Sequence, residues 1–366
     1  MRLTADEARA FRLTDVPPDF IDDPYPYYAA LRRHDPVHEL APGSIFLTRY
    51  EDVAAIYRDP RASSDKRVEF KPRLGDGLLY EHHTTSLVFN DPPLHTRVRR
   101  LIMGALNQRA IARMEPGLVQ LVDRLLDRMG EQGRADLIDD FAAQIPIEVI
   151  GNLLDVPRDE RGPLRGWSLA ILSALEPAPD AGILERGNRA VREFLDYLER
   201  LIAARRRRPG DPDVDVLTRL IRGEADGERL TEKELMHQCI FLLNAGHETT
   251  TNLIGNGMHA LLVHRGELAR LAADPSLVAT AVEELLRYES PLQLNNRVMT
   301  APFEVGGRAF PAGTFVTLGV GAANRDPAQF PDPDRLDLAR GANRHLAFAS
   351  GTHLCLGANL ARLEGR

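Results

Sequence analysis

The chain has 366 residues, which is enough to bury a large core in one domain or in two or three smaller ones. Hydrophobic residues make up 43% of it and charged residues 27%, close to the averages of globular proteins, which excludes a disordered or fibrous chain. The formal net charge of -7 gives no overall attraction for nucleic acid, so nucleic acid is not expected as a partner.

The first residues are charged and contain prolines, with no apolar stretch of the kind found in signal peptides or membrane anchors. The only cysteines are Cys239 and Cys355, which fits a reducing compartment and argues against a disulfide scaffold. We therefore expect a cytoplasmic protein with no membrane partner. Cys239 lies in an apolar helical run and is expected to be a buried structural thiol.

In chain order, alternating β-branched residues first indicate a strand at 44–50. Residues 91–288 then read as helices separated by proline and glycine, and a second strand region follows at 303–320. No repeat, low-complexity tract or flexible linker divides the chain. The pattern predicts a mainly α fold with a small β region, in a single domain over residues 1–366. The clearest helical segments are 97–106, 117–130, 190–208 and 279–288.

Three local patterns do not carry the functions that they suggest. HETTT has Thr251 where a zinc protease needs a second histidine. GNGMHA lies within a helical run with no preceding strand, so it is interpreted as a helix-packing feature rather than a dinucleotide site. The arginines at 205–208 suggest a contact with nucleic acid. They lie at the end of a predicted helix, however, where cations complement the helix dipole on a solvated surface.

Cys355 lies between Gly351 and Gly357 in HLAFASGTHLCLGANLAR, just before a new amphipathic helix. Amide groups and the positive end of a helix dipole stabilise a thiolate, the ionisation state that binds metals. The two glycines allow a flat cofactor to approach the backbone closely. A single thiol does not build a zinc or iron–sulfur site, but it is able to serve as the one axial ligand of a haem, where it favours cleavage of the O–O bond.

The loop FxxGxHxCxG, formed by Phe348, Gly351, His353, Cys355 and Gly357, resembles the haem-ligand loop of cytochromes P450. The resemblance implies that Cys355 is the axial ligand of a haem b. It also implies the fold of that family, with the haem between a long distal helix and the cysteine loop. One departure is Ala349, where many members have glycine, and we expect it to be tolerated.

A second segment, FLLNAGHETTTN, resembles the distal helix of the same family, with Ala245, Gly246, Glu248 and Thr249 in its acid–threonine motif. Thr249 is four residues from Ala245 and is able to bond back to its carbonyl, while Gly246 is expected to open space for dioxygen. Glu248 and Thr249 are the expected catalytic pair, a proton source and a hydroxyl relay, because activation of dioxygen consumes protons.

Two further groups of residues match features of the family. Glu284 and Arg287 lie at i, i+3 spacing in EELLRY, and with Arg335 they match a buried structural triad under the haem loop. Charge-assisted bonds to the haem propionates are expected, by resemblance, from four residues. These are His95, Arg99, Arg297 and His353.

The resemblance covers the chain from about Asp19 to Arg366, with the motifs in the family's order. Members usually continue beyond the helix that follows Cys355, so the C-terminal portion is interpreted as truncated relative to the family. That interpretation keeps open a non-catalytic or inactive haem-binding protein.

The resemblance implies a monooxygenase that inserts one oxygen atom from O2 into a small organic substrate. Its electrons are expected from NAD(P)H by way of a separate ferredoxin and ferredoxin reductase. A docking patch for that partner is expected among basic residues near the cysteine. These residues are Arg97, Arg100, Arg344 and Arg362. A peroxide-driven peroxygenase is the enzymatic alternative, although Glu248 and Thr249 suit the oxygen-driven route better.

By resemblance, four segments form the substrate pocket, and their mixed side chains suit a largely apolar substrate with some polar anchors. These segments are 66–90, 168–186, 242–250 and 292–296. Terpenoid, fatty acid, polyketide and aromatic substrates all remain open.

Overall fold

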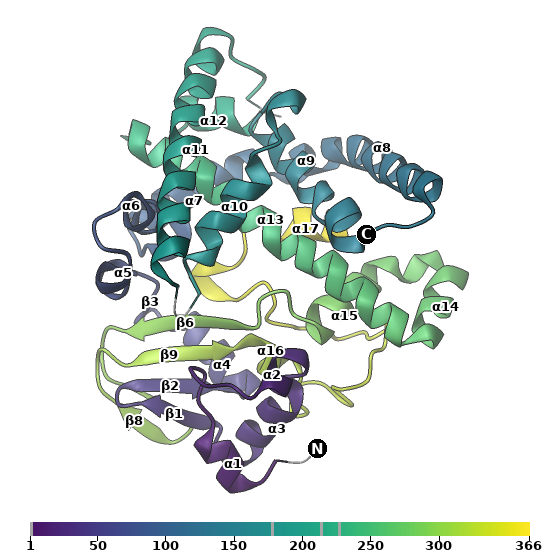
Figure 1. Ribbon diagram of the computed structural model, residues 1–366. Coiled ribbons are helices and arrows are strands. Elements are labelled where there is room, and N and C mark those ends of the chain that lie inside the picture. Colours follow the sequence, from purple (N-terminus) through teal and green to yellow (C-terminus); the bar gives the residue numbers. More distant parts are fainter. Residues whose placement is uncertain (1–2, 177–178, 213–214, 226–227) are drawn as a thin grey trace. The chain divides into compact units, whose positions relative to one another are not determined.

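The computed structural model describes residues 3–176, 179–212, 215–225 and 228–366 (Figure 1). The backbone forms two compact units that alternate along the chain. The first unit holds the described residues up to Ser64, together with Asn256–Cys355 and Arg366. The second unit holds Asp65–Gly255 and Leu356–Gly365. The single domain expected from the sequence stays a prediction.

The first unit contains a five-stranded sheet in the order β1-β2-β9-β6-β3 (Figure 1). β2 and β9 pair in parallel, whereas the other neighbours in this sheet pair antiparallel. β7 and β8 form a separate antiparallel hairpin. The strands are β1 Val37–Ala41, β2 Ser44–Leu47, β3 Ala62–Ser63, β6 Leu294–Met299, β7 Phe303–Val305, β8 Arg308–Phe310 and β9 Phe315–Gly319.

Helices pack on this sheet and beside it through apolar cores. Val53 and Ile56 of α4 belong to one core together with Val316 of β9. Tyr28 of α3 packs edge-on against Phe46 of β2, with ring centroids 6.1 Å apart, in a second, aromatic core. The helical elements are α1 Ala5–Ala10, α2 Pro18–Asp22, α3 Tyr25–His34, α4 Tyr50–Arg58, α14 Arg265–Ala273, η4 Pro275–Leu277, α15 Val278–Tyr288, α16 Val320–Asn324 and η5 Gly351–His353.

The second unit is almost entirely helical and is held by one large apolar core. Its only strands among the described residues are β4 Glu224–Ala225 and β5 Glu228–Arg229, a short hairpin. Its helical elements are α5 Arg67–Leu74, α6 Leu78–Thr85, η1 Leu87–Phe89, α7 Leu94–Ala105, α8 Gln108–Gln132, η2 Leu137–Ala142, α9 Gln144–Leu153, η3 Arg158–Glu160, α10 Leu164–Ser173, α11 Ala181–Arg207, α12 Val216–Arg222, α13 Glu232–Val263 and α17 Ala358–Gly365.

Helix ends in this unit follow from local sequence. The Asn107 side chain accepts hydrogen bonds from the N–H groups of Arg109 and Ala110, which satisfies two donors at the start of α8. Gly133 ends α8 in the left-handed conformation, with φ 66°, which costs glycine nothing. At the start of α11, Asp180 accepts a bond from Ile183 N–H in the same way.

α13 is the longest helix, with 32 residues, and its end beyond Gly255 belongs to the first unit. Its glycines pack closely, as the sequence predicted for GNGMHA. A Cβ on Gly255 would lie 2.5 Å from Ile138, and one on Gly257 would lie 3.2 Å from Leu285. Among the described residues, no helix is long and apolar enough to cross a membrane.

The predicted mainly α fold with a small β region is confirmed. The strand expected at 44–50 is shorter, because α4 already begins at Tyr50, and the region 303–320 divides into β7, β8 and β9. Cys239 is buried, as expected, and burial raises the pKa of its thiol to about 12. The last three residues of the arginine run, 206–208, are exposed, as expected, whereas Arg205 is half-buried and pairs with Asp215 at 2.9 Å.

Candidate functional site

The cysteine loop presents Cys355 at the surface of the first unit. The short helix η5 ends at His353, and the Leu354 N–H donates to the carbonyl of Gly351 at 3.1 Å. The Cys355 N–H then donates to the carbonyl of Phe348 at 3.0 Å. These backbone bonds fix the position of the thiol, which is exposed.

Two residues of this loop have a left-handed backbone. Gly351 has φ 70°, and a Cβ there would collide with the carbonyl oxygen of Tyr57 at the end of α4. Ala349 has φ 59°, a conformation that suits glycine and strains alanine. The loop therefore needs glycine at 351 because of its packing on α4, and it accepts a strained alanine at 349.

Arg297 lies on β6 and is only 6% exposed. Its guanidinium stacks over the ring of Tyr57, 5.4 Å from the centroid, and donates to the carbonyl of Asn296 at 2.6 Å. Burial raises the pKa of Tyr57 to about 12, so its hydroxyl stays neutral. Tyr57 thus contacts two predicted site residues of the first unit, Gly351 through its carbonyl and Arg297 through its ring.

The structural triad differs from the prediction in one member. Glu284 and Arg287 are fully buried and form two bonds of 2.8 Å. The third member is Arg340, whose Nε donates to both carboxylate oxygens of Glu284, at 3.1 and 3.0 Å. Arg335 is exposed and contributes only its carbonyl oxygen, which accepts bonds from Arg287 and Arg340.

The assignment of Arg335 was wrong because sequence spacing alone does not show which side chain of an irregular segment turns inward. Asn343 also donates to Glu284, at 3.0 Å. Neither Arg340 nor Asn343 was predicted, and no helical or strand periodicity marks them in the sequence.

The acid–threonine motif lies in the middle of α13, in the second unit. Thr249 Oγ1 donates to the carbonyl of Ala245 at 2.9 Å, the back-bond expected from their spacing. Both residues are exposed, although their neighbours Leu243 and Thr250 are buried. Glu248 is half-buried, and its pKa is raised, chiefly by burial and also by the charge of Glu176.

Gly246 does not open a groove. A Cβ at this position would lie 2.7 Å from Cδ1 of Ile150, so the Ile150 side chain, on α9, fills the space that the glycine leaves. Gly246 therefore allows α9 and α13 to pack closely, and the expected space for dioxygen is not at this residue. The next residue, His247, is buried, and its Nδ1 lies 3.3 Å from the hydroxyl of Ser168.

His95 and Arg99 lie one turn apart on α7 of the second unit, with His95 buried and Arg99 half-buried. Arg97 lies between them but does not belong to a surface patch. It forms an ion pair with Glu234 of α13 and donates to the carbonyl of Arg229 at 3.0 Å. Of the arginines expected in a docking patch, Arg100 and Arg344 are exposed and Arg362 is half-buried.

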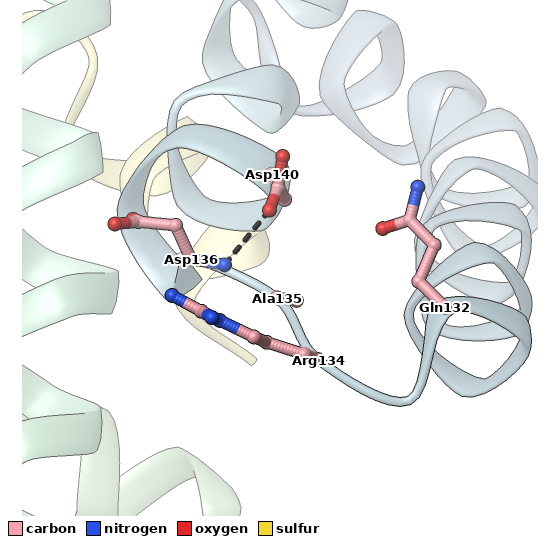
Figure 2. A pocket seen from close by; sticks show the side chains of 5 residues that line it. All are labelled: Gln132, Arg134, Ala135, Asp136 and Asp140. Atoms are coloured by element: carbon pink, nitrogen blue, oxygen red, sulfur yellow. Dashed lines mark hydrogen bonds between the residues drawn. The ribbon is translucent and has the colours of Figure 1, made fainter.

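A polar pocket of about 380 Å³ lies where α8 is followed by η2, and it holds no predicted site residue (Figure 2). Its backbone is held locally, since the Asp136 N–H donates to Asp140 at 2.7 Å. Asp136 in turn caps the first turn of η2. The lining residues are Gln132, Arg134, Ala135, Asp136 and Asp140.

The donor set fits a haem better than a metal held by protein alone. Cys355 is a single exposed thiol on a loop fixed by backbone bonds, as one axial thiolate requires. Within the described parts of the chain, no group of three or more His, Cys, Asp or Glu side chains is arranged to hold a metal ion. Arg297 and Arg99 supply cations on the first and second units respectively.

Comparisons with known proteins identify the family of the chain. Residues 175–366 match the family model "Cytochrome P450". The vitamin D(3) 25-hydroxylase of Pseudonocardia autotrophica is 42% identical over 95% of this chain and 85% of that protein. The cytochrome P450 monooxygenase PikC of Streptomyces venezuelae is 40% identical over 95% of this chain and 82% of that protein.

Solved structures give the same result for the fold. The crystal structure of CalO2 has a TM-score of 0.91 at 34% identity and covers 97% of this chain and 88% of that one. The structure of P450BioI with a fatty-acid-loaded acyl carrier protein has a TM-score of 0.89 at 35% identity, over 96% and 90% of the two chains. With this fold, these relatives and the cysteine loop, the chain belongs to the cytochrome P450 family of haem-containing monooxygenases.

Proposed function

We propose that the chain inserts one oxygen atom of O2 into a C–H bond of a small, largely apolar substrate. In the balanced reaction, the substrate, O2, two electrons and two protons give the hydroxylated product and water. The observation that carries the proposal is the exposed Cys355 thiol, whose loop is positioned by bonds from the Cys355 N–H to Phe348 and from the Leu354 N–H to Gly351. Cys355 would hold the haem iron through its thiolate, and the haem, when bound, would supply the chemistry that activates dioxygen.

Glu248 and Thr249 are proposed to deliver the protons. The raised pKa of Glu248 allows this carboxyl to hold a proton closer to neutral pH than an exposed glutamate does. The Thr249 hydroxyl donates a hydrogen bond to the Ala245 carbonyl, so its lone pairs remain able to accept a hydrogen bond. The hydroxyl would rotate away from that carbonyl, pass its own proton on and take a proton from Glu248 in its place.

Four cationic or hydrogen-bonding residues are proposed to hold the two haem propionates. His95 and Arg99 share one face of α7, because they lie four residues apart. Arg297 is held in place by its contacts with Tyr57 and Asn296, which reduces the entropy lost when it binds an anion. His353 lies in η5, two residues before Cys355.

The proposed electron source is NAD(P)H, acting through a ferredoxin reductase and a ferredoxin in the cytoplasm. Arg100 and Arg344, which are exposed, are proposed to contact the acidic ferredoxin, whereas Arg97 and Arg362 are half-buried. Electron transfer should then slow steeply as salt is added, and an unchanged rate would contradict the docking role.

The test of the function uses the purified, haem-loaded chain, reduced and exposed to carbon monoxide, beside a Cys355→Ser variant. We expect a strongly red-shifted Soret band that only the parent shows. An unshifted band, or no uptake of haem, would refute the assignment of Cys355. Haem binding with no product from any reduced system would instead favour a non-catalytic haem protein, and faster turnover with peroxide would favour a peroxygenase.

A further inference from the structure

The segment 344–347 lies directly before the loop motif that contains the cysteine, and contacts with neighbouring helices of the first unit hold its backbone. The carbonyl of Arg344 accepts a hydrogen bond of 2.6 Å from the hydroxyl of Tyr50, at the start of α4. The Leu346 N–H donates to the buried side chain of Asn324, the last residue of α16, at 2.7 Å. Two helices thus fix the backbone on either side of residue 345.

The side chain of His345 connects the same segment to a third helix. Only 2% of this side chain is exposed. Its Nδ1 accepts a hydrogen bond of 3.2 Å from the Ala347 N–H, so this nitrogen carries no proton. The one proton of the imidazole is then on Nε2, which donates to the carboxylate of Glu283 on α15 at 3.1 Å. Both ring nitrogens are engaged, which holds the ring in one orientation.

The imidazole ring lies against Phe348, the first residue of the loop motif. The two ring centroids are 5.7 Å apart, and the planes are tilted by 52°. Tilted aromatic pairs at this distance attract each other beyond the effect of apolar burial. The carbonyl of Phe348 accepts the hydrogen bond from the Cys355 N–H, at 3.0 Å. Direct contacts therefore run from Glu283 through His345 and Phe348 to the backbone of Cys355.

The strained backbone of Ala349 increases the need for these contacts. Ala349 follows Phe348 directly and has φ 59°. A residue in this conformation persists only where the surrounding structure holds it. Its N–H donates to the carbonyl of Leu346, at 2.8 Å, within the segment that the three helices fix. Loss of the His345 contacts would let the turn relax, and the Phe348 carbonyl would then move away from Cys355.

We propose that His345, held by Glu283, is a positioning residue for Cys355. It keeps the Phe348 carbonyl where this carbonyl accepts the cysteine N–H, and so fixes the thiolate in the geometry that binds the haem iron. A residue that served only the fold would change the free energy of unfolding and leave thiolate ligation in the folded protein unaltered. This inference rests on the proposed role of Cys355 as the axial ligand.

The test follows the red-shifted Soret band of the reduced, haem-loaded protein with carbon monoxide, at a fixed temperature below unfolding. Conversion of this band into an unshifted one measures loss of the thiolate ligand, and urea denaturation of the same samples measures stability. His345→Leu and Glu283→Ala each remove the pair, whereas His345→Gln keeps an N–H donor near the position of Nε2. His38→Leu is the matched control, because His38 is also buried and bonded through both ring nitrogens, to Asp35 at 2.8 Å and to the Phe11 carbonyl at 2.9 Å.

We expect the band to convert about tenfold faster in His345→Leu and in Glu283→Ala, the factor that one net hydrogen bond predicts. The double variant should convert at about the rate of either single variant, because the two side chains act through one contact. His345→Gln should recover most of the parent's rate. His38→Leu should lower the free energy of unfolding and leave the conversion rate unchanged.

Two results would overturn the positioning role. One is conversion at the parent's rate in His345→Leu, and the other is a double variant in which the two single effects multiply. Either result, in a parent that shows the red-shifted band, refutes the positioning role alone. A parent that never shows this band refutes the role of Cys355, and the positioning role falls with it.

Discussion

The guanidinium of Arg287 donates two hydrogen bonds of 2.8 Å to the carboxylate of Glu284, and both side chains are fully buried. Arg340 adds a second cation to the same carboxylate. Arg287 also donates to the carbonyls of Asn324 and Pro333, at 2.9 and 2.8 Å. One ion pair on α15 thus holds the end of α16 and the irregular segment that contains Pro333 and Arg340, and this segment leads into the cysteine loop.

Removing a partner of this ion pair should be severely destabilising. Arg287→Leu leaves the Glu284 carboxylate buried with less compensation, and we expect a loss of about 3–5 kcal/mol in the free energy of unfolding. Arg340→Leu should cost less, because Glu284 keeps its bonds to Arg287. Arg335→Leu, at an exposed position, should change stability by less than about 0.5 kcal/mol. Urea denaturation measures all three, and a large loss in Arg335→Leu would contradict the assignment of Arg340.

Two glycines of the segment that leads to Cys355 should respond differently to alanine. At Gly351 a Cβ collides with the Tyr57 carbonyl, and φ is 70°, so Gly351→Ala should displace the loop and weaken haem retention. At Gly341 a Cβ would meet nothing within 4 Å, so Gly341→Ala should fold and retain haem normally. The rate of haem transfer to apomyoglobin measures retention. Similar rates for both variants would show that the collision with Tyr57 does not decide the loop's position.

The strained Ala349 offers a stabilising change. Its left-handed backbone, with φ 59°, costs an alanine about 1–2 kcal/mol relative to the preferred conformations. Ala349→Gly removes that strain, but glycine makes the unfolded chain more flexible, which offsets part of the gain. We expect the free energy of unfolding to rise by about 0.5–1 kcal/mol. Ala347→Gly is the control, because Ala347 is not among the residues with positive φ and should only lose stability. If Ala349→Gly does not raise the free energy of unfolding, Ala349 is not strained.

Gly246 provides a test of how α9 and α13 pack. Gly246→Ala places a methyl group against Ile150 and should cost about 1–3 kcal/mol by overpacking. Shortening the neighbour in Gly246→Ala/Ile150→Val should recover part of that loss, which a double-mutant cycle measures. Gly266→Ala on α14 meets nothing within 4 Å, so it should be neutral or stabilising. Additive effects of the two substitutions would show that Ile150 does not occupy the space.

The sequence predicted well what depends on local pattern. The helices followed from apolar periodicity, and the Thr249 back-bond followed from a spacing of four residues. Prediction from the sequence failed where contacts between distant segments decide the position of a side chain. Arg335 and Arg340 both lie in an irregular segment without periodicity, and Gly246 is explained only by Ile150, which is about a hundred residues earlier. The Glu283–His345 contact likewise joins residues 62 positions apart.

Finally, Glu248 should make stability depend on pH. Its pKa is raised above the ordinary value of 4.5, so the folded protein binds this proton more tightly than the unfolded chain does. Stability contributed by the neutral carboxyl is therefore present below pH 4.5 and is lost as the pH rises from there through the folded pKa. Glu248→Gln has no such loss, so it should match the parent at pH 4 and be more stable at pH 8.

Denaturant unfolding at the two pH values measures this difference, and Glu199→Gln, at an exposed position of α11, controls for the loss of a carboxylate. If Glu248→Gln is more stable than the parent by the same amount at both pH values, the raised pKa of Glu248 does not cause the difference in stability. The expected result bears on the proposed role of Glu248 in proton delivery, because the burial that raises its pKa is the same burial that destabilises its charged form. The chain then retains a destabilising carboxylate on α13 that a glutamine would improve, as expected of a residue kept for proton delivery rather than for the fold.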